Sequence, residues 1–187
     1  IIPLNFSIFS YIEEHLKLYA GYVLHTNTVL KKINELYEGG EDNMGLISGL
    51  QRRLQFEYNG MRNHENYFAQ FENGAKNIEE VSELYKKITA NFGSFEKWMT
   101  NFKMLATTRG VGWAILYYDK ENDLLINSWL DEQHLGQLNG CDMILAIDMW
   151  EHAYVYDYPT SEKKKYIEAF FENINWSVVE ENYLKAK

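Results

Sequence analysis

The chain opens with two long stretches in which apolar residues recur every three or four positions. This spacing places them on one face of an α-helix. The first stretch covers residues 6–38 and the second covers residues 44–71. Only a short turn separates them, so we expect the two helices to run antiparallel as a hairpin. Two shorter helical patterns follow, at about residues 78–90 and 94–107, and Ser94 is the predicted N-cap of the second.

After residue 110 the pattern changes from helix to strand. Residues 113–118 and 124–129 read as two strands joined by a polar turn, and the apolar run 143–148 reads as a third strand that is buried on both faces. From about residue 161 the pattern is helical again. A long helical hairpin followed by helices around a three-stranded antiparallel sheet is an α+β fold.

Composition and charge restrict the partners of this fold. The chain has 187 residues, of which 46% are hydrophobic and 16% aromatic, enough for a well-packed core. Its formal net charge of −9 argues against a nucleic-acid partner, because no basic stripe is available to displace counterions. Any anionic substrate must therefore be guided by a local positive potential rather than by the net charge.

The cysteine content and the hydropathy of the chain indicate the cellular compartment of the protein. Cys141 is the single cysteine, so the chain forms no intrachain disulfide, which suits a reducing compartment. No apolar run approaches the length of a membrane span. Residues 1–9 also lack the basic segment and cleavage pattern of a secretory signal. We therefore expect a cytoplasmic protein that makes no membrane contact.

The candidate chemistry gathers in the string ILAIDMWEHAYVYDYP. Asp148 and His152 lie four residues apart at the end of the third predicted strand. A carboxylate and an imidazole at this spacing can reach one metal ion where a strand turns into a loop or helix. An isolated pair of this kind is more often a turn cap and a core histidine. The intervening Trp150 and Glu151, and Tyr154 beyond them, favour a metal site.

This string closely resembles the DxWEHAY signature of the iron/manganese superoxide dismutases, and the resemblance extends from about residue 12 to the Asn175-Trp176 pair. It implies a homodimer with one Fe or Mn ion per subunit. It also implies that superoxide is converted to oxygen and hydrogen peroxide while the metal cycles between M(III) and M(II). The ion would lie between a helical hairpin domain over residues 1–75 and an α+β domain over residues 76–187.

The resemblance supplies three ligands directly and leaves the fourth, from the first helix, between two residues. In the family a histidine precedes the gateway tyrosine, here Tyr22, by eight residues. Counting back without a gap reaches Glu14, and His15 is one position later. We favour His15, because three neutral imidazoles and one carboxylate suit Fe or Mn, and Glu14 is the alternative. The predicted metal ligands are His15, His64, Asp148 and His152.

The resemblance also implies two catalytic residues. Tyr22 would stand at the mouth of the substrate channel and relay protons. His134 falls where the manganese enzymes carry a glutamine that hydrogen bonds the metal-bound solvent, and the neighbouring Gln133 competes for this role. Gly60, one turn before His64, matches the manganese-type arrangement. The choice between Fe and Mn stays open.

Three further residues are expected around the ligands. Trp113 and Trp150 would wall the site, keeping it dry and narrow enough to favour a diatomic anion. In the family Glu151 crosses the dimer interface to the metal-binding histidine of the other subunit, where a carboxylate fixes the tautomer and the orientation of the ring. A buried glutamate without such a partner would be costly, so this role implies a homodimer.

Two other functions remain open at this point. If His15 does not bind, then His64, His152 and Asp148 form a 2-His-1-carboxylate set, a pattern used in non-haem iron oxygen chemistry. Alternatively, the protein is a catalytically silent dismutase-like homodimer that binds metal without turnover. Metal content and dismutase activity separate these readings.

Overall fold

A computed structural model describes the backbone of residues 6–39 and 41–187. The chain forms two compact units, with the division between Glu65 and Asn66, inside a continuous helix. The α+β fold class is confirmed, with two long N-terminal helices followed by helices and a three-stranded antiparallel sheet. The predicted domain limits at residues 75 and 76 stay a prediction.

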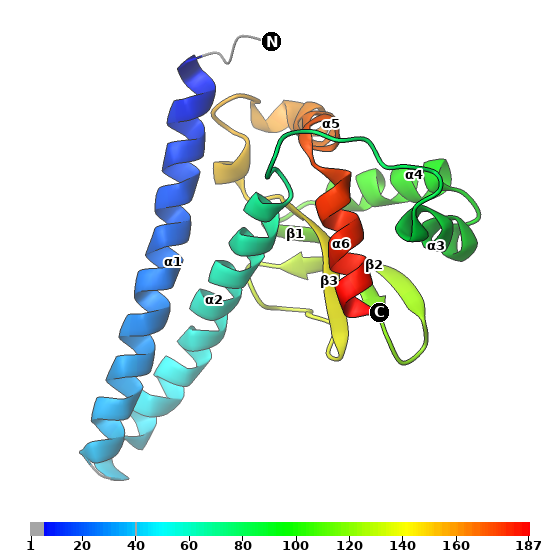
Figure 1. Ribbon diagram of the computed structural model, residues 1–187. Coiled ribbons are helices and arrows are strands. Elements are labelled where there is room, and N and C mark those ends of the chain that lie inside the picture. Colours follow the sequence, from blue (N-terminus) through cyan, green and yellow to red (C-terminus); the bar gives the residue numbers. More distant parts are fainter. Residues whose placement is uncertain (1–5, 40) are drawn as a thin grey trace. The chain divides into compact units, whose positions relative to one another are not determined.

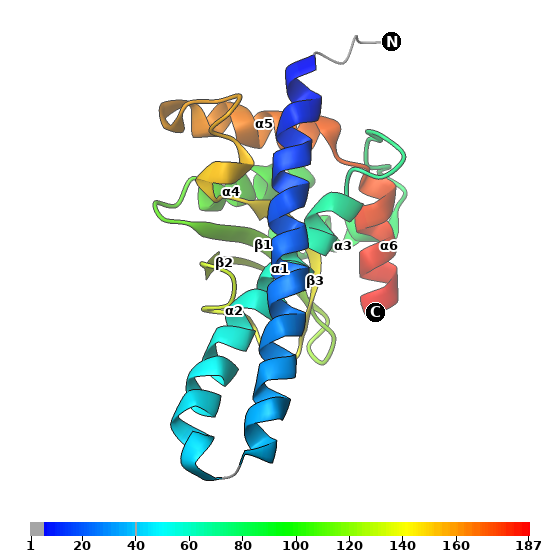
Figure 2. The ribbon, with the colours of Figure 1, turned by 90° about the vertical axis from the view of Figure 1, so that its left-hand side faces the viewer.

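The first unit is an antiparallel helical hairpin (Figure 2). Helix α1 spans Phe6–Glu38 and helix α2 spans Met44–Ala69, and a 3-10 turn at Glu41–Asn43 precedes α2. Both predicted helices are present, and α2 ends two residues before the predicted limit. Apolar residues at turn spacing pack between the helices near the hairpin turn: Val29, Ile33, Leu36, Ile47, Leu50 and Leu54.

Helix α1 has 33 residues, and charged pairs follow its exposed side. Lys32 lies 3.3 Å from Glu35, and Lys17 lies 2.5 Å from Glu14. His25 is also exposed, as the helical pattern predicts. Such a helix is amphipathic. Among the described residues, no helix combines the length and the apolar character that crossing a membrane requires.

Four α-helices of the second unit follow α2. Their bounds are Glu83–Phe92 for α3, Phe95–Ala106 for α4, Lys163–Asn173 for α5 and Trp176–Ala186 for α6. Of these, α3, α4 and α6 each begin at a residue whose side chain caps the helix. The Ser94 side chain accepts from the backbone N–H of Lys97, so the predicted N-cap of α4 is confirmed. Gly93, with φ of 88°, ends α3 in the left-handed conformation.

The sheet of the second unit consists of β1 (Gly112–Asp119), β2 (Leu124–Asp131) and β3 (Cys141–Asp148). Their order is β2-β1-β3 and both pairings are antiparallel, as predicted. Helix α6 contacts β3, while α4 contacts β1 and β2 (Figure 1). In the register of β1 and β3, Trp113 lies opposite Asp148. The sheet therefore fixes these two residues as neighbours at one end of the strands.

Strand β3 lies at one edge of the sheet, and its outer edge is bonded by side chains rather than by another strand. Residues 144, 146 and 148 follow one another at alternate positions, which is the spacing of backbone groups that face the same way in a strand. Each of their carbonyl groups accepts a hydrogen bond from a different helical segment. The donors are Asn182 of α6 to Ile144 (3.2 Å), Gln70 just after α2 to Ala146 (2.7 Å) and Tyr166 of α5 to Asp148 (2.8 Å).

Candidate metal centre

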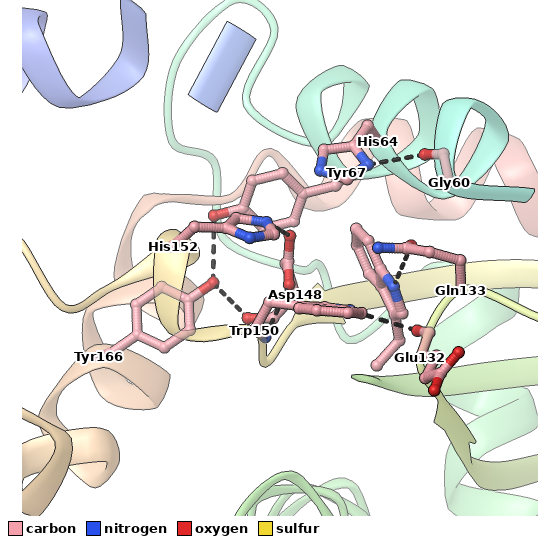
Figure 3. A network of polar contacts seen from close by, with 10 residues as sticks. Gly60, His64, Tyr67, Glu132, Gln133, Asp148, Trp150, His152 and Tyr166 are labelled. Carbon is pink, nitrogen blue, oxygen red and sulfur yellow. Dashed lines mark hydrogen bonds and ion pairs between the residues drawn. The ribbon is translucent and has the colours of Figure 1, made fainter. Parts of the chain in front are cut away.

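Asp148 is the last residue of β3, and its carboxylate is fully buried. One carboxylate oxygen, Oδ1, accepts from the backbone N–H of Trp150 at 2.9 Å. Its backbone carbonyl accepts from the Tyr166 hydroxyl (Figure 3). The aspartate is thus held through both its side chain and its main chain. The second carboxylate oxygen, Oδ2, is directed toward the following 3-10 helix, Glu151–Ala153.

His152 lies on this short helix, with its Nε2 atom 3.2 Å from Oδ2 of Asp148. The Trp150 ring stacks on the His152 ring, with centroids 5.7 Å apart and planes 21° from parallel. The Trp150 indole N–H donates to the backbone carbonyl of Glu132 at 3.3 Å. The indole therefore orients the imidazole (Figure 3). The four-residue spacing of Asp148 and His152 thus brings two candidate ligand atoms, Oδ2 and Nε2, next to each other.

The turn after β2 brings Gln133 to the same end of the sheet. Glu132 adopts a left-handed conformation, with φ of 52°, and the next side chain, Gln133, is fully buried. Gln133 Oε1 accepts from the indole N–H of Trp113 at 2.9 Å, and Trp113 is also fully buried. His134, the residue predicted for the outer-sphere role, is half-buried. Its role and that of Gln133 stay predictions.

In the first unit, His15 of α1 and His64 of α2 lie together. Their rings meet edge to face, with centroids 5.1 Å apart and an interplanar angle of 86°. His15 is 2% exposed and His64 is fully buried. Glu14, the alternative ligand, is exposed and pairs with Lys17. The structure thus places the favoured histidine inside and the alternative carboxylate at the surface.

One hydrogen bond determines which ring nitrogen of His64 carries a proton. Its Nδ1 atom lies 2.6 Å from the backbone carbonyl oxygen of Gly60. A carbonyl can only accept, so Nδ1 carries the proton. In the neutral imidazole the lone pair is then on Nε2. Backbone bonding of this kind is the usual way in which a protein orients a histidine ligand.

Tyr22 packs against the same histidine. Its ring centroid lies 5.0 Å from that of His64 and 6.0 Å from that of Phe56. Position 60 must be a glycine for this packing, because a Cβ atom there would lie 2.5 Å from Cδ1 of Tyr22. Gly60 therefore serves two purposes: its carbonyl orients His64, and its missing side chain makes room for Tyr22.

The donor set fits one class of site. His15 and His64 of the first unit, and Asp148 and His152 of the second, offer imidazole nitrogens and a carboxylate oxygen as candidate metal ligands. Three neutral imidazoles and one carboxylate suit Fe and Mn rather than a thiolate-preferring ion. Nδ1 of His64 and Oδ1 of Asp148 are bonded to the backbone. Such bonds give metal-binding side chains a fixed orientation. These donor types therefore suit an iron or manganese ion.

Comparison with known proteins gives the same class. A family described as "Iron/manganese superoxide dismutases, C-terminal domain" matches residues 80–182. The manganese superoxide dismutase of Nocardia asteroides is 33% identical over 174 residues, covering 92% of this chain and 82% of the relative. The iron superoxide dismutase of Aquifex aeolicus is 34% identical over 180 residues, covering 94% and 83%. The chain belongs to the iron/manganese superoxide dismutase family.

Three residues bonded to the ligand-bearing strand had no signal in the sequence. Tyr166 bonds the Asp148 carbonyl, Tyr67 bonds Tyr166, and Gln70 bonds Ala146. The first two read as core aromatics at helical spacing, and Gln70 reads as an ordinary residue beyond a helix end. Their contacts join segments 18 to 99 residues apart, so only the folded chain identifies them.

Replacing Gly60 by alanine tests the packing of Tyr22. Alanine normally stabilises a helix interior by about 1 kcal/mol relative to glycine. We expect Gly60→Ala to lose stability instead and to change the near-ultraviolet circular dichroism, because the Tyr22 ring must move. Gly49→Ala is the matched control in α2, where an added Cβ meets no atom within 4 Å, and it should gain stability. Equal gains in urea unfolding for both variants would contradict this packing.

Proposed function

We propose that the protein is a superoxide dismutase in which His15, His64, Asp148 and His152 together hold one Fe or Mn ion per subunit. The observation that carries the proposal is the pairing of the fully buried Asp148 with the half-buried His152, with Oδ2 and Nε2 3.2 Å apart, in a chain of this family. Relatives named as iron and as manganese superoxide dismutases are about equally similar to the chain. The proposal therefore admits either ion.

Two of the four proposed ligands, His64 and Asp148, would be oriented before the ion binds. His64 carries its proton on Nδ1 and presents Nε2, while Asp148 keeps one oxygen on the Trp150 N–H and presents the other. The ion would supply the one-electron couple that oxidises one superoxide to oxygen and reduces a second to hydrogen peroxide. Trp150, stacked on His152, and the buried Trp113 would wall the site and limit the access of water to it.

Peroxide formation needs two protons, and the chain offers groups that move or hold them. Tyr22, in ring contact with His64, has a phenolic O–H and is proposed as the proton relay. Gln133 or His134 would make a hydrogen bond to the solvent molecule that the ion holds. The complete burial of Gln133 and its bond to Trp113 support Gln133. His134, the residue favoured by the resemblance, is the alternative.

A homodimer is proposed from the surface around Glu151. Glu151 is exposed, although it lies between the buried Asp148 and the buried Ala153 in the sequence. Val155 and Tyr156, in the same turn, are 49% and 61% exposed. Neighbouring exposed apolar side chains beside a carboxylate suit an interface in which Glu151 accepts from a histidine of the other subunit. The single, unpaired Cys141 supports the cytoplasm as the compartment.

The ligand set is tested with the variants His15→Ala and Glu14→Ala. Purified wild-type protein should contain Fe or Mn and show dismutase activity in a stained gel. His15→Ala should lose both metal and activity, because it removes a buried imidazole donor. Glu14→Ala should retain both, since its carboxylate is exposed. Loss of metal in Glu14→Ala alone would show that the first-helix ligand is Glu14.

The outer-sphere group is tested with Gln133→Leu and His134→Leu. Removing a side chain that supports a metal ligand sphere lowers activity or affinity by about 10–100-fold. We expect such a fall in kcat, with the metal content measured in parallel, for Gln133→Leu. His134→Leu should stay near the wild-type rate. The opposite result would assign the role to His134.

The dimer is tested with Glu151→Ala. Analytical ultracentrifugation should find a dimer for the wild-type protein and a weaker dimer for the variant, because the variant lacks the carboxylate that would bond a histidine across the interface. Metal content should fall as well, since a ligating histidine loses its orienting acceptor. Glu162→Ala, which removes an exposed carboxylate paired with Lys165, is the control. An unchanged dimer with unchanged metal content in Glu151→Ala would refute the bridge.

A further inference from the structure

The end of α2 is attached to β3 by two side chains that no part of the proposed reaction uses. Tyr67 lies in the last turn of α2, and Gln70 is the first residue after it. Tyr67 is 5% exposed and Gln70 is fully buried. Gln70 is bonded directly to the segment of β3 that ends in Asp148, and Tyr67 is bonded to Tyr166, which is itself bonded to Asp148. Buried polar side chains in such a place are held by specific partners, and those partners define what they do.

Gln70 makes a two-point contact with the backbone of one residue of the strand. Its Oε1 atom accepts from the N–H of Ala146 at 2.9 Å, and its Nε2 donates to the Ala146 carbonyl at 2.7 Å. Nε2 also donates to the Tyr67 carbonyl at 3.3 Å. A primary amide bonded to both groups of one residue behaves as an additional strand residue. The two bonds fix both the direction of the Gln70 amide and its distance from β3.

Tyr67 reaches the same strand through a second phenol. Its hydroxyl oxygen lies 3.1 Å from that of Tyr166, and the Tyr166 hydroxyl donates to the Asp148 carbonyl. Each hydroxyl has one proton to donate. Tyr166 donates its proton to the Asp148 carbonyl, so Tyr67 is the donor in the bond between the two hydroxyls. Burial raises the pKa of Tyr67, which keeps this donor protonated. A hydroxyl that accepts one bond donates more strongly in the next, so Tyr67 reinforces the hold on Asp148.

The two attachments lie at alternate residues of β3, at Ala146 and Asp148. Two fixed points along a strand determine both the position and the rotation of the segment attached to it. That segment continues directly into the helix that carries His64, which precedes Tyr67 by three residues and so lies on a neighbouring face of the same helix. The attachment therefore fixes the last turn of α2, which follows His64 in the same helix, on the strand that ends in Asp148.

We propose that Tyr67 and Gln70 are positioning residues for the metal centre, which hold the last turn of α2, the helix that carries His64, on the strand that ends in Asp148. This inference rests on the proposed function, because it takes His64 and Asp148 as ligands of one ion. Neither residue touches the ion. Each acts through the backbone of β3, Gln70 directly and Tyr67 by way of Tyr166.

Tyr67 and Gln70 together are called the clamp. The test compares two clamp variants with two controls that lose similar bonds elsewhere in the second unit. The clamp variants are Tyr67→Phe and Gln70→Leu. Tyr118→Phe removes a phenol bonded to Asp123, and Asn182→Leu removes an amide bonded to Ile144 of the same strand. Each protein is demetallated and reconstituted with Mn²⁺. Its Kd is measured by competition with a chelator, its Mn(II) electron paramagnetic resonance spectrum is recorded, and urea unfolding of the metal-free chain measures stability.

Both clamp variants should bind Mn²⁺ about tenfold or more weakly and show an altered spectrum, while the controls stay within about twofold of wild type. All four should lose stability, so stability alone does not distinguish them. Wild-type affinity and spectrum in Tyr67→Phe, the variant that changes one hydroxyl only, would overturn the positioning role. So would an equal loss in the controls. A wild-type protein that binds neither Fe nor Mn would instead refute the proposed function, and the two failures are thus separate.

Discussion

The candidate site depends on a carboxylate that is buried completely at the end of a strand. Removing a charged carboxylate from water is costly unless hydrogen bonds replace the water. Asp148 meets this requirement with the Trp150 N–H on one oxygen and the His152 ring beside the other. The pairing of β1 and β3 places the residue, and Tyr166 holds its carbonyl. Every other candidate ligand or wall residue of the second unit is oriented with respect to this group.

The first unit prepares its two histidines by different means. His64 is oriented by a backbone carbonyl of its own helix, from the residue one turn earlier. A helix carbonyl bonded in this way serves a side chain as well as the helix, which is favourable at a buried position. The glycine that supplies the carbonyl also admits the ring of Tyr22. One small residue thus determines the tautomer of the candidate ligand His64 and the position of the Tyr22 ring.

Much of this arrangement could be read from local sequence, because periodicity and caps act over a few residues. The hairpin helices, the three strands and the Ser94 cap follow from such patterns. The Asp148–His152 pair is local as well, being separated by four residues. In each case the physical cause lies within one or two turns of the residues concerned.

The remaining features depend on conformation or on distant partners. A positive φ at Glu132 decides that Gln133 rather than its neighbour is fully buried, and no spacing rule anticipates that single turn. The Gln70 contact joins residues 76 positions apart. Helical spacing alone also leaves the identity of the first-helix ligand open. The burial of His15 and the exposure of Glu14 appear only in the fold.

The outer edge of β3 has a consequence beyond the metal centre. An edge strand with unpaired carbonyl and N–H groups can recruit a strand from another chain and begin intermolecular aggregation. Here amide and phenol side chains occupy the carbonyl groups of Ile144, Ala146 and Asp148. The apolar run of β3 is therefore closed to sheet extension for as long as the helices remain in place. The bonds that orient the ligands also protect the protein from self-association through its most hydrophobic strand.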